Sequence, residues 1–166
     1  PSQDFIDLMS ETNYRHPSVK YFCTESRHND FGHSLRDEGL KQATGSYTII
    51  TNADNYFIPK TVEFISAKLA ELQNNKIAPP DVIIWDMVHS HGNPGGRKQP
   101  PYNYFEVDFK PYHIDISSAA IRTELAKSTG FKGKSHDSDQ TYFQDIAKLN
   151  CRLTVAKINS VLLVHN

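Results

Sequence analysis

The chain has 166 residues, of which 38% are hydrophobic and 22% charged, and its net charge at pH 7 is −1. This composition is typical of one globular domain with its own hydrophobic core. A near-neutral chain lacks the positive field expected of a nucleic-acid-binding protein or of a surface that binds anionic lipids. No hydrophobic run approaches the roughly 20 residues that cross a bilayer, and the first residues do not have the pattern of a signal peptide.

Patterns of helix and strand alternate along the chain. The first half predicts a helix tail over 4–9, a strand over 19–23, a helix from Ser34 to Gly45, a strand over 47–51 and a helix that starts at Pro59 and ends before Pro79-Pro80. The second half predicts strands over 82–86 and 102–109, a helix from Ser117 or Ser118 through Ile121 to Gly130, a helix opened by Asp139, and closing strands over 153–157 and 161–164.

Strands that alternate with helices indicate a single α/β domain over 1–166, with a largely parallel sheet covered by helices on both faces. In the helix after Gly32, we expect Ser34 to cap the N-terminus and Asp37 to complete a capping box. Residues 89–101 are rich in glycine and proline and are expected to form a loop or flap.

The cysteines and histidines do not predict a structural metal site. Cys23 and Cys151 lie in hydrophobic, strand-like segments, which favours buried thiols in a reducing compartment and a cytoplasmic location. The closest histidines, His89 and His91, fit no zinc-binding spacing.

Asp54 lies just past the predicted strand 47–51, after Asn52 and Ala53. A carboxylate at the carboxyl end of a buried strand points into the crevice where α/β sheets bind ligands. Its oxygen atoms suit Mg²⁺ or Mn²⁺ held against a diphosphate. A plain turn is the alternative, because the neighbouring Asn52 and Asn55 favour turns as Asp does.

The segment from Gly32 to Tyr47 contains the pattern Arg-x-x-Gly-Leu-x-x-Ala-x-Gly-x-Tyr, starting at Arg36, and leads to Asn52-Ala53-Asp54. It resembles the inverting family 2 glycosyltransferases of GT-A fold, in which such a stretch precedes a strand that ends in Asp-x-Asp. The order downstream is also similar: a core strand over 82–86, a helix ending in Gly130-Phe131, and Ser138-Asp139 at the start of the next helix. The resemblance covers most of residues 4–166.

The resemblance implies a fold of the nucleotide-diphospho-sugar transferase type and a hexosyltransferase-like enzyme of polysaccharide biosynthesis. Such an enzyme would move a sugar from a nucleotide-sugar donor, expected to be a UDP-sugar, to a hydroxyl acceptor with inversion. Two departures stand out. The family's first strand would precede residue 1, so we expect this chain to lack it, which leaves its own activity open. Asn52 replaces the first aspartate of the signature and offers an oxygen without a charge.

An inverting transfer needs a base for the acceptor hydroxyl and positive charge for the leaving diphosphate. The predicted base is Asp139, with Asp137 as its rival; a helix N-cap is a compatible role for Asp139. Arg36, Asn52 and Asp54 are expected to bind the nucleotide diphosphate, Arg36 being otherwise an exposed helix residue.

The resemblance also implies a Mn²⁺ or Mg²⁺ site, for which Asp54 and His165 are the predicted ligands. His165 lies next to the last residue, so a frayed terminal histidine is the alternative. Trp85 could stack on the acceptor sugar or pack in the core, and His89, His91 and Tyr102 could line the acceptor side of the cleft.

Two other functions stay open. A nucleotidyltransferase would use a related α/β sheet, but it needs a glycine-rich phosphate loop with a nearby lysine, which this sequence does not contain. A non-catalytic nucleotide-binding module is favoured by Asn52 and by the expected lack of the first strand. We expect no nucleic-acid partner and no transmembrane segment; peripheral membrane association, oligomeric state, donor sugar and acceptor are left open.

Overall fold

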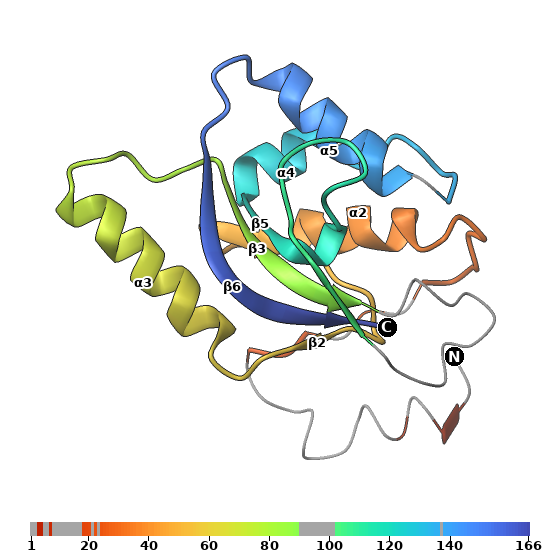
Figure 1. The fold of residues 1–166 in the computed structure, drawn as a ribbon. Helices are drawn as coiled ribbons and strands as arrows, with labels where there is room; N and C mark the ends of the chain where they lie inside the picture. The colour runs from red at the N-terminus through yellow and green to blue at the C-terminus, as the bar shows by residue number, and fades with distance from the viewer. Residues whose placement is uncertain are drawn as a thin grey trace.

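The computed structural model describes residues 3, 4, 7, 18–20, 22, 24–89, 102–136 and 138–166, which form an α/β domain (Figure 1). Its strands are β1 (Tyr47–Ile49), β2 (Tyr56–Phe57), β3 (Val82–His89), β4 (Asn103–Phe105), β5 (Ala119–Arg122) and β6 (Val155–His165). Its helices are α2 (His33–Gln42), α3 (Thr61–Asn74), the short 3₁₀ helix η2 (Ile116–Ser118), α4 (Thr123–Thr129) and α5 (Ser138–Leu149). The predicted α/β class is confirmed.

The sheet is mixed, so the prediction of a largely parallel sheet is wrong. Its strand order is β1-β5-β3-β6-β2, and β4 pairs with β3 beyond the end of β5. Among the described strands only β3 and β6 pair in parallel. A parallel pair needs a long crossover, and α4 and α5 supply one between β3 and β6. No α-helix separates β4 from β5 in the chain, and both return antiparallel to β3.

Strand β6 curves strongly along the sheet (Figure 1). The predicted closing strands over 153–157 and 161–164 belong to one strand, because β6 continues through Asn159 and Ser160, which lie at a shift in register between the pairs Trp85–Ile158 and Asp86–Val161. The register shifts on either side of Asp86, which marks an irregularity of the kind that bends a sheet.

Helices cover both sides of this sheet. α2, α4 and α5 pack together on one side, and α3 lies on the other (Figure 1). Residues 82–87 of β3 are all buried, as expected of a strand with both faces covered. Trp85 is fully buried and its ring contacts Phe57 edge-on, which confirms the core-packing alternative for this tryptophan.

The N-terminus of α2 differs from the predicted capping box. Gly32 is the N-cap with φ 84°, a left-handed conformation that glycine adopts without strain. Ser34 lies inside the helix, and Asp30 accepts hydrogen bonds from its backbone nitrogen at 2.9 Å and from its hydroxyl at 2.5 Å. The carboxylate of Asp37 instead accepts from the backbone nitrogen of Phe131 at 2.7 Å and ties α2 to the end of α4.

Several other elements differ from their predicted boundaries. The residues of 19–23 that the structure describes form no strand, Pro59 precedes α3, and the strand expected over 102–109 is limited to β4. Ile121 lies on β5 because the helix starts only at Thr123. Cys151 is an exposed free thiol in the turn before β6, so its predicted burial is wrong. Cys23 and residues 90–101 lie outside the described residues.

No helix in the described part of the chain has the length and apolar character needed to cross a membrane.

Candidate functional site

A polar cavity of about 290 Å³ lies where the N-terminal parts of α2 and α5, the loop after β1 and the end of β6 meet. Its lining consists of Phe31, His33, Arg36, Asn52, Asp54, Asp115, His136, Asp139, His165 and Asn166. Five of these ten residues are predicted site residues, namely Arg36, Asn52, Asp54, Asp139 and His165. Residues far apart in the sequence therefore meet at one polar hollow. Asp137, the rival base, lies outside the described residues.

Arg36 is the centre of this cavity's polar network and is not an exposed helix residue, since its side chain is only 12% accessible. Its Nη1 donates to Oδ1 of Asp139 at 2.7 Å, and its Nη2 donates to Oδ1 of Asn52 at 2.5 Å. The guanidinium therefore joins α2, the loop after β1 and the first turn of α5. A bound diphosphate would have to share or displace these contacts.

His33 supports the guanidinium from behind. Its Nδ1 lies 2.9 Å from Nη1 of Arg36, and its Nε2 lies 2.9 Å from the carbonyl oxygen of Ser135. The ring is stacked on Phe131 with centroids 5.6 Å apart. The sequence reasoning did not select His33 as a site residue, since a histidine at the start of a helix has no distinctive local pattern.

Asp139 lies in the first turn of α5. Burial raises the pKa of this carboxyl above its ordinary value and Asp115 adds to the rise, while the positive charge of Arg36 offsets part of it. A helix N-terminus alone would lower the pKa and weaken the base. Desolvation outweighs that expectation here, so Asp139 is a stronger base than an exposed aspartate.

Asp115 and His165 form a second polar pair in the cavity, with Nε2 of His165 3.3 Å from Oδ2 of Asp115. Burial opposes ionisation of Asp115, but the pKa of this carboxyl is nonetheless lowered by His165 and by hydrogen bonds from Ser117. His165 is the last residue of β6 and is buried, so the alternative of a frayed terminal histidine is wrong. The Asp-x-x-Ser spacing of Asp115 and Ser118, which form a capping box, was the signal that could have drawn attention to Asp115.

Asp54 lies at the exposed rim of the cavity in a turn. The backbone nitrogen of Asn55 donates to the carbonyl oxygen of Asn52 at 3.3 Å, which closes that turn. The side-chain nitrogen of Asn166 donates to the carbonyl oxygen of Asp54 at 2.6 Å and joins the turn to the end of β6. Asp54 therefore lies in a turn and also lines the cavity, and its carboxylate is accessible.

The oxygen and nitrogen atoms that line the cavity are of the types that bind divalent cations. Three carboxylates line it, from Asp54, Asp115 and Asp139, against one guanidinium. A diphosphate would be repelled by this set unless further positive charge accompanied it. Within the described residues, however, no three histidine, cysteine, aspartate or glutamate side chains are grouped closely enough to hold a metal. The residue types therefore fit a cation, but a three-ligand cluster is not formed in this arrangement.

Two of the predicted acceptor-side residues lie next to the end of β6. His89 is opposite His165 in the register of β3 and β6, and the pKa of His89 is lowered by burial and by the charge of His165. The hydroxyl of Tyr102 donates to the side-chain oxygen of Asn166. His91 lies outside the described residues.

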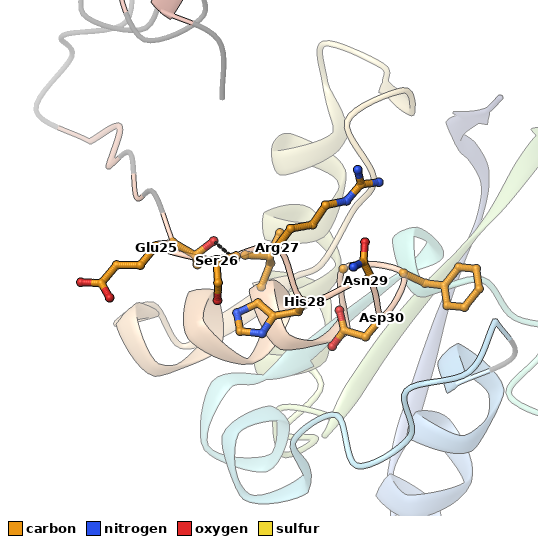
Figure 2. A pocket seen from close by; sticks show the side chains of 10 residues that line it. Glu25, Ser26, Arg27, His28, Asn29 and Asp30 are labelled. Atoms are coloured by element: carbon orange, nitrogen blue, oxygen red, sulfur yellow. Dashed lines mark hydrogen bonds between the residues drawn. The ribbon is translucent and has the colours of Figure 1, made fainter.

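A second cavity, of about 450 Å³, lies beside the start of α2 (Figure 2). One continuous segment, 24–32, lines it together with Leu35. In Figure 2 the side chains of Glu25 and Arg27 point in different directions and do not converge on a common centre. Because binding sites need convergent polar groups, we assign the function to the cavity around Arg36.

No protein-family model matches the chain, and no curated protein sequence matches it.

Proposed function

We propose that this chain is a glycosyltransferase of GT-A type that moves a sugar from a nucleotide-sugar donor, expected to be a UDP-sugar, to a hydroxyl acceptor with inversion. The observation that carries the proposal is the convergence of Arg36, Asn52, Asp54, Asp139 and His165 on one cavity. These residues were selected for chemical roles in one reaction, and they come from four separate segments of the chain.

Asp139 is the proposed general base. Its carboxylate takes the proton of the acceptor hydroxyl as that oxygen attacks the anomeric carbon. The bond from this carbon to the diphosphate oxygen then breaks, and its electron pair leaves with the nucleoside diphosphate. Burial raises the pKa of Asp139, which brings the group closer to the basicity that proton transfer needs.

The proposed role of Arg36 differs from the direct contact with the diphosphate that was expected from the sequence. Its guanidinium holds Asp139 and Asn52 through two short hydrogen bonds, so its main role is to position them. Asn52 thereby keeps its place beside Asp54 without a negative charge of its own. A divalent cation, expected to be Mn²⁺ or Mg²⁺ and held by Asp54 and His165, would neutralise charge on the departing diphosphate.

Two rival functions make different predictions. A nucleotidyltransferase would release pyrophosphate, whereas a glycosyltransferase releases a nucleoside diphosphate. A non-catalytic module would bind a nucleotide without turnover, and the ion pair between Arg36 and Asp139 is the observation that favours it, because it occupies one oxygen of the proposed base. Product analysis separates all three.

The test combines binding and turnover. Thermal denaturation is followed with UDP, GDP or dTDP, with and without Mn²⁺, for the wild-type chain, for Asp54→Ala and for the control Asp108→Ala, whose exposed side chain pairs with Lys110. A ligand of the folded state raises the melting temperature. We expect a Mn²⁺-dependent rise with UDP that is lost only in Asp54→Ala.

Incubation with UDP-sugars and hydroxyl acceptors should then yield UDP and a glycoside of inverted anomeric configuration, measured by NMR. A retained configuration would contradict the inverting mechanism. Nucleotide binding without any UDP release would favour the non-catalytic module.

A further inference from the structure

His33 is a buried titratable residue that the proposed transfer does not use directly. It is the first residue of α2 and is 1% exposed. Its ring lies on Phe131, which is in turn stacked on Tyr142 with centroids 4.3 Å apart. This aromatic stack fixes the plane of the imidazole, so both ring nitrogens have defined directions.

The two partners of the ring also define which nitrogen carries the hydrogen. The carbonyl oxygen of Ser135 can only accept, so Nε2 of His33, 2.9 Å away, must donate. The guanidinium of Arg36 can only donate, so Nδ1, 2.9 Å from Nη1, must accept. A neutral imidazole with its hydrogen on Nε2 satisfies both partners, and the opposite tautomer satisfies neither.

Each of these two hydrogen bonds connects His33 indirectly to Asp139. Through Nδ1, His33 holds the same nitrogen of Arg36 that donates to Oδ1 of Asp139 at 2.7 Å. Through Nε2, it anchors Ser135, whose backbone nitrogen donates at 2.9 Å to the hydroxyl of Ser138, the residue that opens α5 and precedes Asp139. The imidazole is therefore a brace between α2 and the segment that carries the proposed base.

We propose that His33 is a positioning residue, which in its neutral Nε2–H form orients the Arg36 guanidinium and the start of α5 so that the Asp139 carboxylate is held at the cavity. Its effect on turnover depends on the proposed function; its effect on geometry does not. A side chain displaced by about 1 Å can lower a rate by about 100-fold, so a brace of this kind has a measurable consequence.

The first experiment needs no substrate. Nitrogen NMR of the wild-type chain should report the Nε2–H tautomer of His33, and it should report separate, exchange-protected Nη signals for Arg36, as expected of a guanidinium held by directional hydrogen bonds. A proton on Nδ1, or Nη signals averaged by free rotation, would overturn the proposal.

Three substitutions separate the two contacts. Asn places an amide oxygen near the position of Nδ1, Gln places an amide nitrogen near that of Nε2, and Phe keeps the stacked ring but neither polar contact. His33→Asn should keep the protected Arg36 signals, whereas His33→Gln and His33→Phe should lose them. His28→Asn, an exposed histidine on the segment before α2, is the matched control and should behave as wild type.

Turnover supplies the second measurement. We expect His33→Phe to lower kcat by about 100-fold and His33→Gln by about tenfold, with His33→Asn closest to wild type and the donor KM changed by less than about threefold throughout. Equal kcat values in the Phe and Asn variants would show that only packing matters and would refute the positioning role. If the wild-type chain transfers no sugar, the proposed function fails, and the NMR signals alone decide the role of His33.

Discussion

Asp86 and Asp139 are two aspartates of this protein that are each paired with a cation, and they differ in how completely their oxygens are satisfied. Asp86 is 4% exposed and receives hydrogen bonds from Tyr104 at 2.8 Å, from the backbone nitrogen of Val107 at 2.9 Å and from Lys157 at 2.9 Å. Asp139 has a side chain that is 24% exposed and lines a cavity.

The difference distinguishes Asp86, whose contacts are structural, from Asp139, the proposed base. Asp86 lies at the register shift between β3 and β6 and uses both oxygens to join β3, β6 and the segment after β4. In the described part of the chain, hydrogen bonds from protein donors reach only Oδ1 of Asp139. A buried carboxylate with full hydrogen bonding stabilises a fold, whereas one with an oxygen facing a cavity can exchange a proton with a ligand.

Asp139→Asn is expected to have the largest effect. Under the proposed function, removing the proposed base should lower kcat for sugar transfer by about 1,000-fold, because general base catalysis contributes about 10² to 10⁴. The melting temperature at neutral pH should change less than in Asp86→Asn, because loss of the ion pair with Arg36 is offset by removal of a partly buried charge. Asp145→Asn, on the same helix and paired with Lys148 at 3.1 Å, is the control and should keep its activity. Transfer at a normal rate by the Asp139→Asn chain would show that the base is elsewhere.

Asp86→Asn should lower the stability and leave kcat unchanged. It leaves Lys157 without its buried anion and gives Tyr104 a weaker acceptor, so the free energy of unfolding should fall by about 2 to 3 kcal/mol. Urea denaturation measures this loss. The folded fraction should retain normal kcat, and a variant that lost turnover while keeping its stability would place Asp86 in the chemistry.

Tyr104→Phe tests one hydrogen bond of the same cluster. It removes the hydroxyl that donates to Oδ2 of Asp86, and because Tyr104 is 60% exposed and water can replace much of this hydrogen bond, the free energy of unfolding should fall by less than in Asp86→Asn. Tyr112→Phe is the control, since that tyrosine is 79% exposed. Equal denaturation midpoints for the two variants would mean that the Tyr104 hydroxyl adds nothing to stability.

The pH dependence of stability should differ in sign between two aspartates of the cavity. The raised pKa of Asp139 means that the native state binds its proton more tightly than the unfolded chain, so its contribution is present at low pH and is lost as the pH rises through its native pKa. The lowered pKa of Asp115 contributes stability above its unfolded pKa, which is lost as the pH falls through its native pKa.

Urea midpoints measured between pH 3 and 7 check this sign. Relative to wild type, Asp115→Asn should be least stable at the neutral end, and Asp139→Asn should gain relative stability as the pH rises. Parallel curves for the two variants would contradict the opposite shifts.

Much of the local structure was predictable. The hydrophobic run 82–86 predicted a buried strand because nothing polar interrupts Val82 to Trp85, and the helical spacing after Pro59 predicted α3. The capping box at Ser34 failed because Asp30 competes for the same backbone nitrogen, and the polar pair Asn159-Ser160 did not end β6 because pairing with β3 continues past it.

The sequence by itself determined the alternation of strands and helices, the absence of a strong net charge, and a set of polar residues that includes Arg36, Asp54 and Asp139. Tertiary structure decided the mixed sheet, since strand direction depends on which connections carry a helix. It also decided the meeting of Arg36 with Asp139 and Asn52, the burial that raises the pKa of Asp139, and the brace formed by His33. Desolvation and hydrogen-bond partners depend on residues distant in the chain, and no local pattern encodes them.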